Sequence, residues 1–502
     1  MILQTLNYAL TQGIATITFD EQGSPVNTMC QQWQQDLATV TAQLLQDKAQ
    51  VRGVILASAK STFFAGADLK SVMRTGPDDG PRFFKEIEAI KRCFRHIETL
   101  GVPVVTCING AALGGGLEVA LVGHHRIAVN NDKLLLGFPE VNLGLIPGGG
   151  GITKLTRLLG LLAAQPYLME CKLFNPQEAL KLGVVHALVD TDAQLRERAL
   201  AYIEASQGKP EAAQHVWDRK DYKMPGGSPN TPKLAGLLSV APAMLKQKTR
   251  GLYPAPEAAL AAMVEGALVD FDTAMRIESR YLAALMRSQV TRNMINTFFF
   301  NMNSYRLARK TASTTAPTQP DGAQEALRLL LAEKRPARPG EPAWPTGTAF
   351  IGRLLRVYMA EGQALAAEGV PTPAIENLAL QTGMAWGPLA LGVAMASAEA
   401  LAPQTKVPEL EGQDIKDRLL YRQAIEAARC LSEGVTTVAD ANLESIFGQG
   451  FPAWTGGVLQ FIYGQGVGAF QRRCEALAAR YGAGFVVAPE VINALEQHMP
   501  VY

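Results

Sequence analysis

The chain has 502 residues, of which 47 are Lys or Arg and 46 are Asp or Glu, so its formal net charge is +1. This balance provides no overall attraction to nucleic acid or to an anionic membrane, and any anionic ligand has to be bound by a local site. With 48% hydrophobic and 19% charged residues, the composition is that of a globular protein, and the length predicts roughly two to four domains.

The cysteines and the apolar runs indicate the cellular compartment of the protein. No uninterrupted apolar run approaches the ~18 residues of a membrane-spanning helix, and the N-terminal residues lack the basic and apolar parts of a secretion signal. We therefore expect a cytoplasmic protein without an integral membrane segment. The six cysteines, at positions 30, 93, 107, 171, 430 and 474, are too scattered for a zinc ribbon or a redox pair, so we expect reduced, structural thiols.

The first ~190 residues alternate short β-type runs with helical patterns, which is typical of an α/β domain. Residues 13–19 alternate as a half-buried strand, and residues 51–57 form a more continuously apolar one. Between them, residues 24–27 predict a turn, and an amphipathic helix follows to about Asp47.

Two carboxylates and two glycine clusters lie within residues 104–151. An apolar strand at 104–108 ends in a turn, and the triple glycine 114–116 then leads into a helix-like segment that carries Glu118; Glu140 follows, before the glycines of 144–151. Glycines at the start of a helix let backbone N–H groups approach a substrate oxygen, where the helix dipole favours negative charge. This stretch is therefore suited to stabilising an oxyanion. A second small-residue turn at 61–69, which includes Gly66, could provide another donor.

With these pieces in place, residues 1–190 resemble the crotonase (enoyl-CoA hydratase/isomerase) superfamily. The resemblance rests on five motifs in order, at residues 64–69, 109–118, 138–140, 144–151 and 176–185. It implies an α/β crotonase fold, a ββα spiral. It also implies that Glu118 and Glu140 flank the α and β carbons of an acyl-CoA thioester, whose carbonyl oxygen is held by the N–H groups of Ala67 and Gly115. The residues expected near the substrate and its coenzyme A are Ala65, Gly66, Asp68, Leu69 and Gly114.

Two glutamates favour a hydratase over an isomerase. Adding water to a double bond conjugated to a thioester requires a base for the water and an acid for the α-carbon, while the carbonyl oxygen gains enolate character. Like charges in one site raise one pKa, so a neutral and an ionised Glu can coexist. Superfamily isomerases manage with the carboxylate in the position of Glu140. The alternative reading, in which Glu118 and Glu140 are ordinary solvated side chains, is disfavoured by the motifs around them.

Three other features are better interpreted as structural. The adjacent His124 and His125 have no Cys or carboxylate at ligand spacing, so we expect no metal site. The glycines 148–151 are not followed by Lys and Ser or Thr, which excludes a P-loop, and we interpret them as a turn packed beneath Glu140. Cys107 lies in an apolar strand and is expected in the core rather than as a nucleophile.

Residues 191–310 predict a helical extension. This arrangement is similar to the multifunctional fatty-acid oxidation α-subunits of bacteria, in which a nicotinamide-binding Rossmann domain would begin near Lys310. Residues 311–346 instead have the Pro-rich composition of a linker. The one Gly-x-Gly-x-x-Ala, at residues 464–469, has no βαβ context and is weak. We therefore expect no NAD cofactor and no dehydrogenase activity.

The C-terminal part contains an internal duplication. Arg353, Glu368 and Leu378 recur 65 residues later as Arg418, Glu433 and Leu443 (418 − 353 = 433 − 368 = 443 − 378). The pattern predicts two all-α repeats, at residues 347–410 and 411–502. They resemble the paired C-terminal domains of 3-hydroxyacyl-CoA dehydrogenase.

Together these features predict an enoyl-CoA hydratase of fatty-acid β-oxidation that acts on trans-2-enoyl-CoA. Coenzyme A would enter only as part of the substrate, and no metal is expected. Two alternatives stay open: a Δ3-Δ2-enoyl-CoA isomerase that relies on Glu140, and a scaffold subunit of a β-oxidation complex. For partners, we expect a thiolase-like β-subunit or a second copy of the chain, and no nucleic acid.

Overall fold

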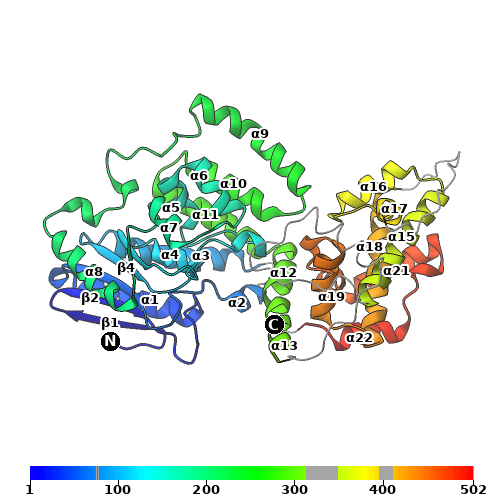
Figure 1. Cartoon of the computed structure of the whole chain (residues 1–502), viewed down its shortest axis with the longest axis horizontal. Helices are drawn as coiled ribbons and strands as arrows, with labels where there is room; N and C mark the ends of the chain where they lie inside the picture. The colour runs from blue at the N-terminus through cyan, green and yellow to red at the C-terminus, as the bar shows by residue number, and fades with distance from the viewer. Residues whose placement is uncertain (75, 77, 312–348, 395–410, 501–502) are drawn as a thin grey trace. The chain divides into compact units, whose positions relative to one another are not determined.

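The structure is a computed structural model that describes residues 1–311 except 75 and 77, residues 349–394, and residues 411–500. The chain divides into two compact units, Met1–Ser288 and Gln289–Tyr502 (Figure 1). Residues 312–346 of the predicted linker and residues 395–410 of the first predicted repeat lie outside the described residues.

The first unit is built on a six-stranded sheet with the order β1-β2-β3-β4-β6-β9. The strands are β1 (Leu6–Thr11), β2 (Ile14–Phe19), β3 (Gly53–Ser58), β4 (Val104–Ile108), β6 (His125–Val129) and β9 (Ala187–Val189). β1 and β2 form an antiparallel hairpin, and the remaining neighbours pair in parallel. The hairpin turns at Gln12 and Gly13, which both have positive φ, as tight hairpin turns require.

The strands predicted at 13–19, 51–57 and 104–108 are confirmed as β2, β3 and β4. β4 is buried at every residue, which explains its continuous apolar run, because a parallel strand covered on both faces has no solvent side. The predicted helix ending near Asp47 is confirmed as α1, Gln31–Gln46.

A second, three-stranded sheet lies next to three of the motifs. It consists of β5 (Ala112–Leu113), β7 (Leu136–Gly137) and β8 (Leu173–Phe174), with β5 and β7 parallel. The helices around the two sheets are α1, α2 (Leu69–Met73), α3 (Gly80–Glu98), α4 (Gly115–Ala120), α5 (Gly151–Leu159), α6 (Leu161–Met169), α7 (Pro176–Lys181) and α8 (Asp192–Ala205), with 3-10 turns η1 (Lys48–Gln50) and η2 (Glu140–Leu143).

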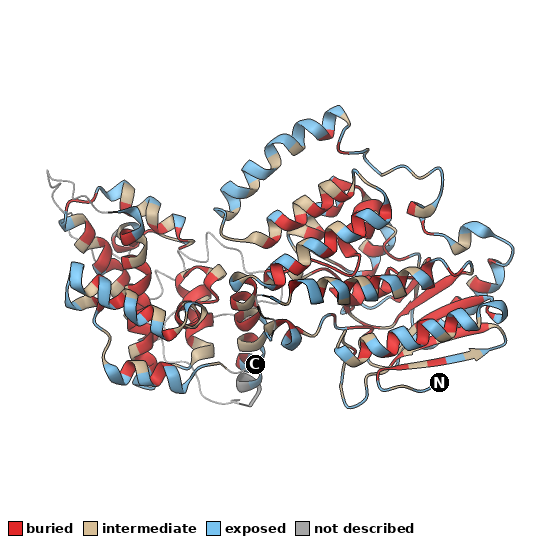
Figure 2. Cartoon of the chain, turned by 180° about the vertical axis from the view of Figure 1, so that it is seen from behind, coloured by how far each residue is buried: buried red, intermediate tan, exposed pale blue. Residues whose placement is uncertain are grey.

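The helical extension begins inside the first unit. After the 3-10 turns η3 (Pro210–Ala213) and η4 (Val216–Asp218) come α9 (Pro232–Thr249), α10 (Pro254–Gly266) and α11 (Phe271–Met286). α11 packs on α3, α5 and α10. α9 buries only Leu234 and extends away from the rest of its unit in Figure 1, exposed over most of its length in Figure 2.

The second unit is helical, as predicted. Its helices are α12 (Gln289–Ile295), α13 (Met302–Thr311), α15 (Ala349–Ala367), α16 (Thr372–Gln381), α17 (Pro388–Ala394), α18 (Gly412–Ser432), α19 (Val438–Glu444), α20 (Val458–Gln465), α21 (Val467–Tyr481) and α22 (Pro489–Gln497). Shorter turns are two π-helical segments, η5 (Asn296–Asn301) and η6 (Ser445–Gln449), and two 3-10 turns, η7 (Ala453–Thr455) and η8 (Ala483–Phe485). The core is shared by both predicted repeats, and α15 and α18 form its most extensive helix pair.

The duplication is visible in the ion pairs between α15 and α18. Arg353 Nε donates to Glu426 at 2.6 Å, and its guanidinium also contacts Glu433. Its counterpart Arg418 donates to Glu361 at 2.6 Å and contacts Glu368. The 65-residue offset relates every partner (353 + 65 = 418, 361 + 65 = 426, 368 + 65 = 433), so each repeat binds the other through equivalent residues, as in a symmetric dimer interface. That these repeats are of the dehydrogenase type stays a prediction.

Candidate active site

The pairing of β5 with β7 brings the two carboxylates together. Each strand leads directly into one of them: β5 runs into α4, which carries Glu118, and β7 is followed by η2, whose first residue is Glu140. The Gly114 N–H donates to the carbonyl of Gly137 at 2.8 Å. The two segments that begin at these glycines are therefore held side by side.

Gly114 provides the space in which Glu140 lies. Its φ is +56° and its ψ −128°, a backbone conformation open to glycine because it has no Cβ. A Cβ placed on Gly114 would stand 2.5 Å from Oε1 of Glu140. The glycine is thus needed both for the turn into α4 and for the approach of the carboxylate.

Glu118 is held by the glycine loop at the start of α5. Its side chain is buried, and Oε1 accepts hydrogen bonds from the N–H groups of Gly149 at 2.7 Å and Gly151 at 2.8 Å. Burial raises the pKa of Glu118 to about 7, and the negative charge of Glu278 adds to this effect, while the two N–H groups and the charge of Lys91 act against it. Glu118 can therefore change protonation state near neutral pH.

Glu140 lies in a different environment. Its Oε2 is buried and has no hydrogen-bond partner among the described residues. Burial, and after it the charge of Glu118, raises the pKa of Glu140 well above its usual range. A carboxyl with a raised pKa and an unpaired oxygen is suited to remain protonated and to donate a proton.

Two backbone N–H groups lie close to this pair. The chain at Gly66–Ala67 forms a bridge with Met29, and Gly66 faces the start of α4: a Cβ placed on Gly66 would stand 3.5 Å from the N atom of Gly115. In the part of the chain that the structure describes, neither the Ala67 nor the Gly115 N–H donates to a backbone acceptor. The turns that carry the two donors expected for an oxyanion are thus neighbours.

The remaining expected ligand contacts cluster at the same turn. Ala65 and Ala67 are exposed, Gly66 and Leu69 are buried, and Asp68 is half-buried. Asp68 caps α2, since its Oδ1 accepts from the N–H of Lys70 at 3.0 Å. Their contact with coenzyme A stays a prediction, and so do the roles of Gly114, Ala67, Gly115 and the two glutamates.

Glu278 is a third carboxylate of the site that the sequence motifs did not indicate. It lies on α11, is fully buried, and accepts from the N–H groups of Gly150 at 2.6 Å and Thr153 at 2.8 Å. Within the glycines 148–151, interpreted above as a turn beneath Glu140, Gly149 and Gly151 donate to Glu118 and Gly150 donates to Glu278. The sequence signal that could have identified Glu278 is a charged residue on the apolar face of an amphipathic helix, because such a residue is buried only with partners.

The other residues singled out in the sequence have structural surroundings. His124 accepts from the N–H of Val104 at 3.1 Å and its Nε2 lies 3.0 Å from the carbonyl oxygen of Glu98, so both ring nitrogens are used in the core. Burial lowers the pKa of His124 to about 4. Cys107 is buried, as predicted, and burial raises its pKa to about 12.

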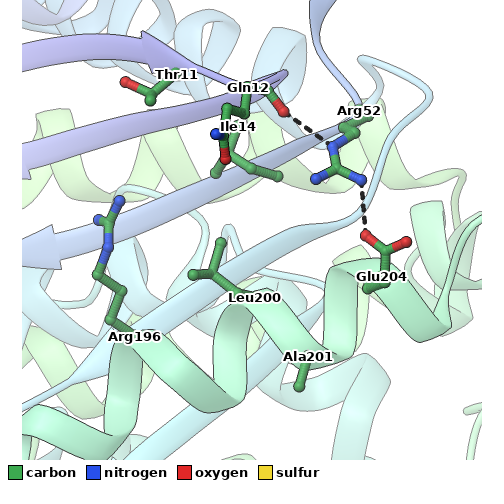
Figure 3. A pocket seen from close by; sticks show the side chains of 8 residues that line it. All are labelled: Thr11, Gln12, Ile14, Arg52, Arg196, Leu200, Ala201 and Glu204. Atoms are coloured by element: carbon green, nitrogen blue, oxygen red, sulfur yellow. Dashed lines mark hydrogen bonds and ion pairs between the residues drawn. The ribbon is translucent and has the colours of Figure 1, made fainter.

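A separate pocket of about 360 Å³ lies between the β1–β2 hairpin and α8. Figure 3 shows Arg52 at its edge, donating to the carbonyl of Gln12 and to the carboxylate of Glu204. None of the candidate site residues lines this pocket, so it is distinct from the carboxylate pair. Among the described helices, none is long and apolar enough to cross a membrane.

Comparison with known proteins gives a family match for the first unit. Residues 9–221 match the family model described as enoyl-CoA hydratase/isomerase. The chain is similar to the fatty acid oxidation complex subunit alpha of Shewanella loihica, with 32% identity over 300 residues that cover 59% of this chain and 40% of that protein. For the same subunit of Shewanella halifaxensis the identity is 33% over 295 residues, covering 57% and 39%. The chain thus spans about two fifths of the length of these curated relatives.

Solved structures give a weaker likeness. An enoyl-CoA hydratase from Shewanella pealeana is 25% identical with a TM-score of 0.38, covering 42% of this chain and 77% of that one. An enoyl-CoA hydratase from Bacillus anthracis is 25% identical with a TM-score of 0.37, covering 59% and 96%. Because both TM-scores lie below 0.5, these likenesses add nothing to the family match.

Proposed function

We propose that this chain adds water to trans-2-enoyl-CoA and forms the 3-hydroxyacyl-CoA. The match of residues 9–221 to the enoyl-CoA hydratase/isomerase family model supports this proposal. The observation that carries the proposal is the unequal environment of the two carboxylates. Oε1 of Glu118 accepts two backbone N–H groups, whereas Oε2 of Glu140 is buried without a partner among the described residues. One group is prepared to be ionised and the other to be protonated.

The proposed reaction uses both states. Ionised Glu118 takes a proton from water, and the oxygen attacks the β-carbon of the enoyl thioester. The electron pair of the double bond moves toward the carbonyl, whose oxygen gains negative charge and is bound by the N–H groups of Ala67 and Gly115. Glu140 then donates its proton to the α-carbon, so that the elements of one water molecule are added across the double bond.

The test is hydration of crotonyl-CoA and of longer enoyl-CoA thioesters, followed by loss of the enoyl absorbance. We expect Glu118→Gln and Glu140→Gln each to lower kcat by about 10²- to 10⁴-fold, the range that general acid–base groups contribute. Glu211→Gln, which changes an exposed carboxylate, is the matched control and should keep the wild-type rate. Absence of hydration by the wild-type chain, or full activity of both variants, would contradict the proposal.

The second candidate is a Δ3-Δ2-enoyl-CoA isomerase, and the unpaired Oε2 of Glu140 favours it because a single carboxyl could remove and return a proton. This activity would consume 3-enoyl-CoA and survive Glu118→Gln, which a hydratase would not. Loss of isomerisation in Glu118→Gln would exclude a Glu140-only mechanism.

The expectations on cofactor and partners also stay proposals. We propose that added NAD changes neither reaction, and NADH formation from 3-hydroxyacyl-CoA would contradict this. A thiolase-like partner or a second copy of the chain would be detected by co-purification and by the mass of the particle in solution.

A further inference from the structure

One face of α11 packs against Gly148 and Gly150 of the glycine loop that binds Glu118. A Cβ placed on Gly148 would stand 1.9 Å from Cδ2 of Leu282, and one placed on Gly150 would stand 2.8 Å from Cε of Met275. Met275, Glu278 and Leu282 are spaced three and four residues apart, so they lie on one side of the helix. The loop has no free space on this side, and α11 determines where its backbone can lie.

The polar contacts of the loop alternate between two carboxylates. Gly149 and Gly151 donate to Glu118, while Gly150 and Thr153 donate to Glu278. Gly150 is the N-cap of α5, and Gly151 and Thr153 lie in its first turn, where N–H groups have no partner inside the helix; Gly149 directly precedes them. The direction of each N–H toward Glu118 therefore depends on its neighbour being bound by Glu278.

Glu278 is a costly residue to bury and is compensated accordingly. It is 0% exposed, and Lys91 Nζ lies 3.3 Å from its Oε1. The same ammonium donates to the carbonyl of Met275 at 2.6 Å and to Ser279 Oγ at 2.8 Å. A buried carboxylate with this set of partners is strongly restricted in position. Lys91 on α3 is its ion-pair partner, and the charge of Glu278 acts on Glu118 of α4 and Glu140 of η2. Two charged groups lie nearby with other partners: Glu88 on α3 accepts from Ser279 at 2.6 Å, and Lys154 on α5, beside Gly150, pairs with Glu98.

We propose that Glu278 is a positioning residue of the candidate active site: it binds the loop at the start of α5 so that the N–H groups of Gly149 and Gly151 hold Glu118. The inference rests on the hydratase function proposed above. It places a residue of the helical extension, 57 positions beyond the family match that ends at residue 221 (278 − 221 = 57), in the support of the reaction.

The main test is Glu278→Gln in the full chain. The amide NH₂ cannot accept a hydrogen bond, so one of the two loop N–H groups loses its acceptor. We expect kcat for crotonyl-CoA hydration to fall by about 10- to 100-fold, as for a small displacement of a catalytic group, with KM changed by less than about threefold. Because a negative charge beside Glu118 is removed, the acidic limb of the kcat/KM profile should move to lower pH by roughly half a unit or more.

Two further variants separate charge from hydrogen bonding and from fold. Glu278→Asp keeps the charge on a shorter side chain, so kcat should fall while the acidic limb keeps its wild-type position. Glu265→Gln removes a carboxylate that binds Arg280 and Tyr281 of α11 without touching the loop. It should change neither the rate nor the acidic limb.

Hydrogen exchange measured by mass spectrometry provides a readout that does not depend on activity. Amides of residues 148–154 should exchange faster in Glu278→Gln and Glu278→Asp than in the wild type. In Glu265→Gln they should exchange at the wild-type rate. The inference would be overturned if either Glu278 variant exchanged its loop amides at the wild-type rate and also kept a kcat within about twofold of the wild type. If Glu278→Gln does not fold, the loop exchange and the kcat of Glu278→Asp test the inference in its place. If the wild type hydrates no enoyl-CoA, the proposed function fails, whereas the exchange result still decides whether Glu278 holds the loop.

Discussion

The two candidate catalytic carboxylates differ in what surrounds each oxygen. Glu118 is bound by N–H groups from a loop, and Glu140 presents an unpaired oxygen beside Gly114. Burial raises the pKa of both carboxyls, and nearby charge adds to this: that of Glu278 for Glu118, and those of Glu118 and Glu278 for Glu140. In such a coupled pair the protons are released in steps that belong to the pair, and only the intermediate state, with one proton bound, provides both a base and an acid.

The pH dependence of hydration follows from this. The pKa of Glu118 is raised to about 7, and the base must be ionised, so kcat/KM should decrease as the pH falls below about 7, by up to about tenfold per pH unit. Glu140, whose pKa is raised well above its usual range, should stay protonated near neutral pH. The measurement is a kcat/KM profile with crotonyl-CoA. A rate that is constant from roughly pH 5 to pH 8 would contradict the assignment of Glu118 as the base.

Gly114→Ala should affect both the backbone and Glu140. The new methyl group would stand 2.5 Å from Oε1 of Glu140, at a residue with φ of +56°. We expect a loss of about 1–3 kcal/mol in the free energy of unfolding from backbone strain, and a loss of activity because Glu140 has to move.

The matched control for that substitution is Gly183→Ala. Gly183 has a φ of +73° and no atom within 4 Å of an added Cβ, so an added Cβ is strained by the positive φ but makes no such contact. It should lower stability but keep the wild-type kcat per folded molecule. Equal kcat values in Gly114→Ala and the wild type would show that Glu140 does not need its present position.

At the scale of elements, the sequence predicted what depends on neighbouring residues. β2, β3 and β4 follow from alternation or from continuous apolar runs, and α1 follows from its amphipathic pattern. The role of the loop before α5 was not predictable in this way. Its partner Glu278 is 128 residues from Gly150 along the chain, and local patterns carry no information about which distant helix covers a loop.

The duplicated Arg residues provide a prediction about the helix pair α15 and α18. Arg418 has only 2% of its side chain exposed and Arg353 has 22%, although their partners are equivalent. Removing a buried partner leaves an uncompensated charge, so Arg418→Met should lower the free energy of unfolding by about 3 kcal/mol or more. Arg353→Met removes a more solvated pair and should cost about 1 kcal/mol. The comparison is made by urea unfolding.

A double-mutant cycle checks the physical reason for that difference. In Glu361→Gln the buried partner of Arg418 is neutral, so adding Arg418→Met should cost less than it does in the wild type. Equal costs for Arg353→Met and Arg418→Met would show that burial does not distinguish the two equivalent ion pairs.

For the molecule as a whole, the sequence motifs located the α/β domain but not all of the unit that contains it. The motifs end near residue 185, and the family match ends at residue 221, while the compact unit continues to Ser288. The physical reason is packing: α10 and α11 cover α5, and α11 also packs on α3. For helices that lack a motif, the sequence predicted the helix but not the element it packs on, because their contacts lie far away along the chain.

This division leads to the prediction that residues 1–288 are sufficient for hydration. Glu118, Glu140, Ala67, Gly115, Glu278 and Lys91 all lie in this range, and the fragment ends where the compact unit ends. We expect it to hydrate crotonyl-CoA with a kcat within about threefold of the full chain, since no acid–base group is lost.

The matched fragment is residues 1–221, which corresponds to the family match but lacks α11. Without Glu278, Met275 and Leu282, the glycine loop loses its acceptor and its cover, and exposed apolar surface remains where α10 and α11 pack. We expect this fragment to be inactive, and to be unstable by circular dichroism and thermal unfolding. Full activity in the shorter fragment would show that α11 is dispensable, and an inactive but folded 1–288 fragment would show that hydration needs residues beyond Ser288.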